Sequence, residues 1–116
     1  MAKPKALVTS GPTYEPIDPV RFIGNRSSGK QGYAIAEALR DAGFDVTLVT
    51  GPVALNDPKG VKMVRVQTAV EMLAAWEKAL PADVAVFAAA VSDWLVKKVA
   101  GKKLKKTGAA PKLALV

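Results

Sequence analysis

The chain has 116 residues, half of them hydrophobic, which is enough for one small domain with its own core and excludes a disordered chain. It contains no cysteine and no histidine, so Cys/His zinc sites and nucleophiles activated by histidine are excluded within it. No apolar run is long enough to cross a membrane, and the first strand begins too early to leave room for a signal peptide. We therefore expect a cytoplasmic protein without membrane contacts.

The first half of the chain predicts a strand, a long loop and a helix. Residues 5–9 have the pattern of a short buried strand. Residues 11–28 show no periodicity and hold three prolines, so we expect a packed loop without regular structure, of a length that is usually functional. A helix is predicted over residues 29–42, with Ser28 as its N-cap and Gln31 as the capping-box partner.

The second half predicts further strands and one more helix. Thr68 followed by Glu71 is a capping box, so a helix is expected to start there. The apolar run 83–90 is continuous, which is typical of a strand buried on both faces of a sheet. The expected elements are strands over 45–51, 61–67 and 83–90, a helix over 68–80 and the beginning of another strand over 112–116.

This order of elements predicts an α/β, Rossmann-like three-layer domain with a mostly parallel sheet. Right-handed crossovers give the strand order 3-2-1-4, numbered along the chain, and place the switch point between the first and fourth strands. Ligands of such sheets bind outside the carboxyl ends of the strands at the switch point, which here are residues 10–13 and 88–93. Residues 24–32 open the helix after the first strand and should border the same crevice.

The stretch 24–32 holds three glycines, two serines, two amides and two cations, which predicts an anion site at a helix start. It is not a P-loop, because Gln31 stands where the magnesium-binding hydroxyl belongs and the preceding strand is too distant. A dinucleotide site is disfavoured, because the strand over 45–51 ends without an acid that would hold the ribose.

Residues 97–106 contain six of the 17 cations and no acid, while the remaining 11 cations nearly balance the ten acids of the chain. Nucleic-acid binding is disfavoured, because no aromatic residues are interleaved with these lysines. A solvated face is the simplest reading. The alternative is a mobile basic flap over 97–110 that closes on a bound polyphosphate.

Five segments together resemble the phosphopantothenoylcysteine synthetase family of coenzyme A biosynthesis. They are Thr-Ser-Gly-Pro-Thr at 9–13, Asp-Pro-Val-Arg-Phe-Ile at 18–23, Asn-Arg-Ser-Ser-Gly-Lys-Gln-Gly at 25–32, Ala-Ala-Ala-Val-Ser-Asp-Trp at 88–94 and Lys-Leu-Lys-Lys at 103–106. In bacteria this domain is usually the C-terminal half of a bifunctional protein whose N-terminal half is a flavin decarboxylase. The resemblance implies a single nucleotide-binding domain over residues 1–116, without flavin, that is the N-terminal part of the synthetase domain.

The resemblance further implies a ligase that works in two steps. The carboxylate of 4′-phosphopantothenate attacks CTP to give an acyl-cytidylate and pyrophosphate, and cysteine then displaces CMP to form the amide. Mg²⁺ would accompany the triphosphate, with unknown protein ligands, and the complete domain would be a homodimer. The residues leave two alternatives open: an ATP-using form of the same ligase and a non-catalytic nucleotide-binding domain.

The family motifs also imply roles for individual residues. Asn25 would hold the acyl intermediate, with Ala90 bordering the substrate, and Lys103 would reach the triphosphate from the flap. Asp93 would help to fix the nucleotide, although an aspartate at this place also suits a simple turn. Arg21 has no assigned role and also suits a salt bridge within the loop. The implied nucleotide-binding residues are Gly11, Ser27, Gly29, Gly32, Phe87, Ala88, Ala89, Asp93 and Lys103.

Overall fold

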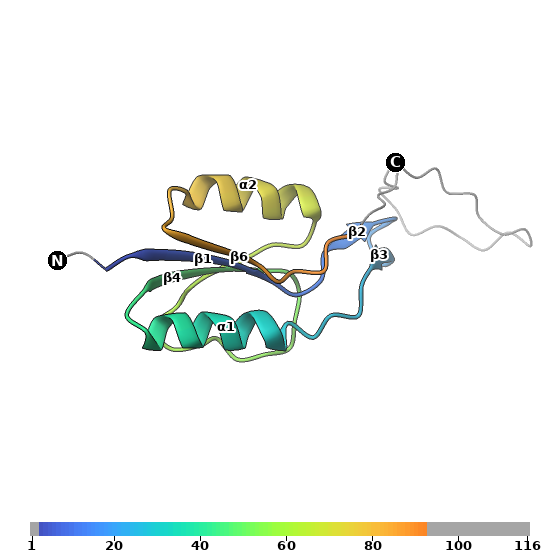
Figure 1. Cartoon of the computed structure of the whole chain (residues 1–116). Helices are drawn as coiled ribbons and strands as arrows, with labels where there is room; N and C mark the ends of the chain where they lie inside the picture. Colours follow the sequence, from blue (N-terminus) through green and yellow to red (C-terminus); the bar gives the residue numbers. More distant parts are fainter. Residues whose placement is uncertain (1–2, 93–116) are drawn as a thin grey trace, which may run out of the picture.

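The computed structural model describes residues 3–92 of the chain. One sheet contains four parallel strands, with a helix on each face, so the predicted three-layer α/β architecture is confirmed (Figure 1). The strand order β5-β4-β1-β6 is the predicted order 3-2-1-4. The elements are β1 (Lys5–Ser10), β2 (Tyr14–Pro16), β3 (Phe22–Gly24), α1 (Lys30–Asp41), β4 (Asp45–Thr50), β5 (Lys62–Arg65), α2 (Ala69–Ala79) and β6 (Val84–Phe87).

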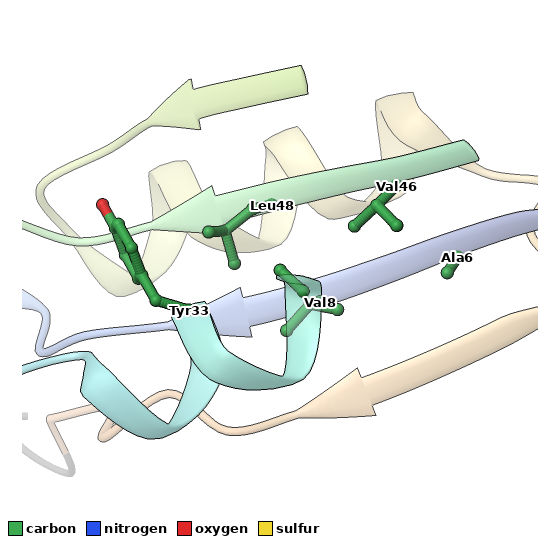
Figure 2. Close-up of a cluster of buried hydrophobic side chains, with 6 residues drawn as sticks. Ala6, Val8, Tyr33, Val46 and Leu48 are labelled. Atoms are coloured by element: carbon green, nitrogen blue, oxygen red, sulfur yellow. The ribbon is translucent and has the colours of Figure 1, made fainter. Parts of the chain in front are cut away.

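The hydrophobic core lies on both faces of β1 and β4, the two central strands. Between the sheet and α1, Val8 and Leu48 are fully buried beside Tyr33 (Figure 2). On the other face, Leu7 and Val49 pack against Met72 of α2. Both strands are therefore covered on both faces, which explains why each contains adjacent apolar residues, Leu7–Val8 in β1 and Leu48–Val49 in β4.

Helix α1 begins differently from the prediction. Its N-cap is Gly29, with φ 78° in the left-handed region, and no side chain caps it. The Ser28 hydroxyl accepts a long bond of 3.4 Å from the N–H of Lys30 instead of the predicted capping-box contact. The left-handed turn is open to glycine and strained for other residues, so Gly29 defines the start of the helix and the prediction of Ser28 as N-cap is wrong.

The loop predicted over residues 11–28 contains a short hairpin, so the prediction that it has no regular structure is wrong. Strands β2 and β3 pair antiparallel beyond the carboxyl ends of the main sheet (Figure 1). Tyr14 stacks on Phe22 with ring centroids 3.9 Å apart. The turn between the strands is fixed by Asp18, whose carboxylate accepts the N–H groups of Val20 and Arg21 at 2.8 and 2.7 Å. Three-residue strands are too short to show a recognisable alternation of apolar and polar residues, so no strand was predicted here.

Strand β6 is not buried on both faces, contrary to the prediction. It pairs with β1 only and forms an edge of the four-stranded sheet within residues 3–92. Phe87 is 74% exposed and lies against Trp76 of α2, with ring centroids 4.4 Å apart. The apolar side chains of α2 are likewise buried only in part, since Leu73 is 58% exposed.

The predicted capping box of α2 is confirmed. The Thr68 hydroxyl accepts the N–H of Glu71 at 3.1 Å, and the Glu71 carboxylate accepts the N–H groups of Thr68 and Gln67 at 2.9 and 3.1 Å. These hydrogen bonds lower the pKa of Glu71 from its usual value, and the bond from the Thr68 N–H contributes most. Desolvation of the carboxylate acts in the opposite direction but does not cancel them.

We predict that Glu71→Gln lowers the free energy of unfolding by about 0.5 kcal/mol at pH 7, because an exposed carboxylate at a helix N-terminus contributes on that scale. The pKa of Glu71 is lower in the folded state, so its contribution is complete above the unfolded-state pKa and is lost as the pH falls through the folded-state pKa. Urea unfolding of both proteins at pH 7 and near pH 3 should therefore show a difference at neutral pH that shrinks in acid. An equal difference at both pH values would contradict this explanation.

The described part of the chain contains no helix that is long and apolar enough to cross a membrane. The predicted basic flap over 97–110 and the strand predicted to begin at 112 lie outside the described residues.

Candidate functional site

The two strands that flank the predicted switch point are neighbours, and their carboxyl ends run on side by side. The N–H of Ala88 donates to the carbonyl of Thr9 at 3.1 Å, and the N–H of Ala90 donates to the carbonyl of Gly11 at 2.8 Å. Pro12 and Ala90 then form an isolated parallel bridge. The two strand ends that the predicted order brings to the switch point are therefore side by side, and Gly11, Ala88, Ala89 and Ala90 lie where the sequence predicts the ligand crevice.

The start of α1 lies directly against the end of β1. The buried Ser10 hydroxyl donates to the carbonyl of Gly29 at 3.0 Å. A Cβ on Gly32 would lie 2.4 Å from the Cβ and hydroxyl oxygen of Ser10, so only glycine permits this approach. The first turn of the helix is thus held beside the crevice without intervening side chains, with its positive dipole end at the carboxyl edge of the sheet.

Asn25 joins the hairpin to the end of β6. Its side-chain amide nitrogen donates to the carbonyl of Ala90 at 3.0 Å, so the two residues that the sequence motifs predict to contact the substrate are in contact with each other. The same carbonyl accepts the N–H of Thr13 at 3.2 Å. Asn25 itself is exposed, and Ser27, two residues further on, is half-buried and accepts a long bond of 3.4 Å from the N–H of Gly29.

Phe87 lies apart from these groups. Its ring contacts Trp76 and therefore lies on the α2 face of the sheet, whereas the start of α1 lies on the opposite face. Between β6 and α2 there is an open groove of about 520 Å³. Its lining is almost entirely apolar and consists of Thr9, Ala69, Met72, Leu73, Trp76, Phe87, Ala89 and Val91.

Three comparisons with known proteins agree on one family. The family model described as the DNA/pantothenate metabolism flavoprotein C-terminal domain matches residues 1–116. The chain belongs to this family. It is 55% identical over 113 residues to the coenzyme A biosynthesis bifunctional protein CoaBC of Mycolicibacterium smegmatis, a match that covers 96% of this chain and 27% of that protein.

Solved structures of the family have the same fold. The C-terminal domain of a coenzyme A biosynthesis bifunctional protein CoaBC matches with a TM-score of 0.79 and 48% identity, over 90% of this chain and 54% of that one. A mutant of Cab2, solved in complex with phosphopantothenate-cysteine, matches with a TM-score of 0.74 over 97% of this chain and 56% of that one. At 20% identity the second likeness shows the fold alone. The chain thus spans about half the length of these solved chains and about a quarter of the curated relative.

Two of the residues to which the family motifs give roles, Asp93 and Lys103, lie outside the described residues. The others are placed, and all but Phe87 have their backbone or side chain at the edge of the sheet where the hairpin and the start of α1 meet. Arg21 forms an ion pair of 3.9 Å with Asp18, so the salt-bridge reading that the sequence left open is the one observed.

Sequence reasoning gave no individual role to three residues that join the segments at this edge of the sheet. Ser10 bonds the start of α1, as described above. Thr13 is fully buried, and its hydroxyl accepts the N–H of Ser92 at 2.8 Å while its carbonyl accepts the Ser92 hydroxyl at 3.3 Å. Glu15, 3% exposed, accepts the N–H of Ala69 at 3.1 Å. Each bond joins segments that are distant in sequence, so the only sequence signal was the position of Ser10 and Thr13 at the predicted end of the first strand, and Glu15 had none.

The described residues contain no group of three or more acidic side chains that could hold a metal ion. The cations nearest to the start of α1 in sequence, Arg26 and Lys30, are exposed. What this site offers is therefore backbone N–H groups, hydroxyls, one amide and nearby positive charge. These groups suit an anionic ligand such as a phosphate ester.

Proposed function

We propose that this chain forms the nucleotide- and acyl-binding half of a phosphopantothenate–cysteine ligase. The observation that carries the proposal is the Asn25–Ala90 contact at the carboxyl edge of the sheet, where α1 also begins without a side-chain cap. Membership of the family and 48% identity to a CoaBC C-terminal domain support it. The substrate pair phosphopantothenate and cysteine is suggested by the name of the Cab2 complex.

In the first step the carboxylate of 4′-phosphopantothenate attacks the α-phosphorus of CTP, and pyrophosphate leaves. The substrate supplies the nucleophile, so the chain needs no histidine or cysteine, and catalysis depends on position and charge stabilisation. Gly11, Ser27, Gly29 and Gly32 would surround the phosphates with backbone N–H groups at the positive end of α1. Ala88 and Ala89 would meet the nucleotide through the backbone.

In the second step the amine of cysteine attacks the acyl carbonyl, and CMP leaves with the electron pair of the broken bond. Negative charge develops on the acyl oxygen, and a fixed N–H donor stabilises it more than it stabilises the ground state. Asn25 is the side chain we assign to this role. Its amide is already oriented by the Ala90 carbonyl, which reduces the reorganisation needed during the reaction.

The proposal also includes residues outside the described range 3–92: Lys103 would contact the triphosphate and Asp93 the nucleotide. Within that range, the backbone of Phe87 would contact the nucleotide from the edge strand β6, while its ring lies on the α2 side of the sheet. Magnesium would arrive with the triphosphate, whose own oxygens are ligands that Mg²⁺ prefers. The complete enzyme would be a cytoplasmic homodimer; ATP replaces CTP in the alternative form of the ligase.

The ligand class is tested by measuring Tm in parallel with CTP, ATP, NAD or DNA, with Mg²⁺ present in every sample. A ligand at 100 times its Kd stabilises the folded state by about 2.7 kcal/mol. For a chain of this size the expected rise in Tm is roughly 10 °C. We expect the rise with CTP, a smaller one with ATP, and none with NAD or DNA. A larger rise in Tm with NAD would contradict the ligase proposal and favour a dinucleotide-binding enzyme. A salt-sensitive rise in Tm with DNA would favour nucleic-acid binding.

A further inference from the structure

Glu15 is a buried carboxylate whose partner lies far away in the sequence. It is the central residue of β2, and its carboxylate oxygen accepts the N–H of Ala69, the first residue of α2, at 3.1 Å. The residue is only 3% exposed. Burying a carboxylate costs free energy unless it is hydrogen-bonded, so a carboxylate at this position needs an explanation beyond surface solubility.

Capping of α2 provides only part of that explanation. The capping box of Thr68 and Glu71 satisfies the N–H groups of these two residues from within their own segment, and Glu15 satisfies the N–H of Ala69. Glu15 adds a bond from a different element, 54 residues earlier in the chain. A second bond runs the same way, since the N–H of Tyr14 donates to the carbonyl of Gln67 at 2.6 Å. Both bonds attach the hairpin to the segment where α2 begins.

The hairpin in turn carries Asn25. Glu15 pairs with Ile23 and Tyr14 pairs with Gly24, the residue directly before Asn25. A shift of β2 is therefore transmitted through the hairpin to the base of the Asn25 side chain. The bond from Asn25 to the Ala90 carbonyl is 3.0 Å, near the middle of the normal range, so a displacement of about 1 Å would break it.

We propose that Glu15 is a positioning residue, which ties the β2–β3 hairpin to the N-terminus of α2 and thereby holds the Asn25 amide against the Ala90 carbonyl. The charge matches the place, because the helix N-terminus is positive and favours a carboxylate. The consequence for acyl transfer rests on the role proposed above for Asn25. The consequence for the hairpin does not, because it concerns the chain without any ligand.

The hairpin is tested by NMR on the 116-residue chain without nucleotide. The chain has only two asparagines, so the side-chain amide signal of Asn25 can be assigned against that of Asn56. In Glu15→Ala we expect this signal to move to the position of a solvent-exposed amide, and the N–H groups of Thr13 and Tyr14 to exchange at least ten times faster. Glu15→Gln keeps an acceptor oxygen and should restore both readouts. If Glu15→Ala does not fold, Glu15→Asp takes its place as the test. It keeps the charge on a side chain too short to reach the N–H of Ala69, so it should change both readouts in the same direction as expected for Glu15→Ala.

Glu71→Gln is the matched control, because it weakens the same helix end without touching the hairpin. It should lower stability while leaving the Asn25 signal and the exchange of Thr13 and Tyr14 unchanged. An Asn25 signal that stays in place in Glu15→Ala and Glu15→Asp overturns the proposal. So does an equal disturbance in Glu71→Gln, because the effect would then be general loosening.

The consequence for the reaction is measured in a complete synthetase domain that contains this chain. We expect Glu15→Ala to lower kcat about 10- to 100-fold with the KM for the nucleotide unchanged, and Glu15→Gln to recover most of kcat. A moved Asn25 signal with normal kcat would contradict the role of Asn25, and hence the proposed function, while leaving the positioning of the hairpin intact. A rise in KM for the nucleotide with unchanged kcat would overturn a role in positioning for acyl transfer.

Discussion

Gly32→Ala is expected to lower the free energy of unfolding by about 1–3 kcal/mol, even though alanine normally stabilises a helix relative to glycine by about 1 kcal/mol. The reason is the contact between α1 and β1. The added Cβ would lie 2.4 Å from both the Cβ and the hydroxyl oxygen of Ser10 and 3.1 Å from its Cα. The helix start must then move away from the crevice, so the same substitution should abolish the stabilisation by CTP.

The compensating variant for this prediction is Ser10→Gly. It removes the Cβ and the hydroxyl that the new methyl group would meet, so the double variant should recover part of the stability lost in Gly32→Ala. Recovery is incomplete because the Ser10 hydroxyl also bonds the Gly29 carbonyl. Urea unfolding of the single and double variants provides the measurement. Additive losses of stability would show that the contact between these two residues is not the cause.

Asn25→Asp is expected to give the second large effect, a loss of about 10²–10³ in the rate of acyl transfer, with the chain still folded. The substitution replaces a donor by an ionised group that only accepts. In the structure the lost donor faces the Ala90 carbonyl at 3.0 Å, so the carboxylate would meet an oxygen there. The phosphates of the proposed nucleotide would add further negative charge. Asn25 is exposed, which is why the fold should tolerate the change.

Single-turnover kinetics in a complete synthetase domain containing this chain separate the two steps. Release of pyrophosphate should continue while formation of the amide is slowed, so that the acyl-cytidylate accumulates. Circular dichroism of the variant serves as the control for folding. Amide formation at the wild-type rate would exclude Asn25 from the second step, whereas slowing of both steps equally would place it in the binding of the nucleotide.

Much of the fold could be predicted from local pattern. Apolar runs at the residues of β1 and β4, the capping box at Thr68 and the glycine-rich stretch before α1 each have a physical cause within a few neighbouring residues. The strand order followed because right-handed crossovers leave few arrangements for that order of elements. The convergence of residues 10–13 with 88–90 was a consequence of this topology, and the backbone bonds between Gly11 and Ala90 confirm it.

What the sequence could not provide depends on partners that are distant along the chain. The strands of the β2–β3 hairpin are too short to show a two-residue hydrophobic period. The hairpin is held by contacts to distant segments: Glu15 bonds the start of α2, and Asn25 and Thr13 bond the chain just after β6. The exposure of Phe87 follows from the edge position of β6 within residues 3–92, which an apolar run by itself does not indicate.

The start of α1 shows the same division within a single motif. From the sequence, Ser28 and Gln31 satisfied the local rule for a capping box, and the glycines indicated an anion site. In the structure the end of β1 occupies the space beside the helix, so Gly32 must approach Ser10 and Gly29 takes the left-handed turn. Local residue types thus determined that a helix begins here, and they predict an anionic ligand. The packing against β1 decided which residue caps it, because steric contact between distant segments outweighs a side-chain hydrogen bond of about 1 kcal/mol.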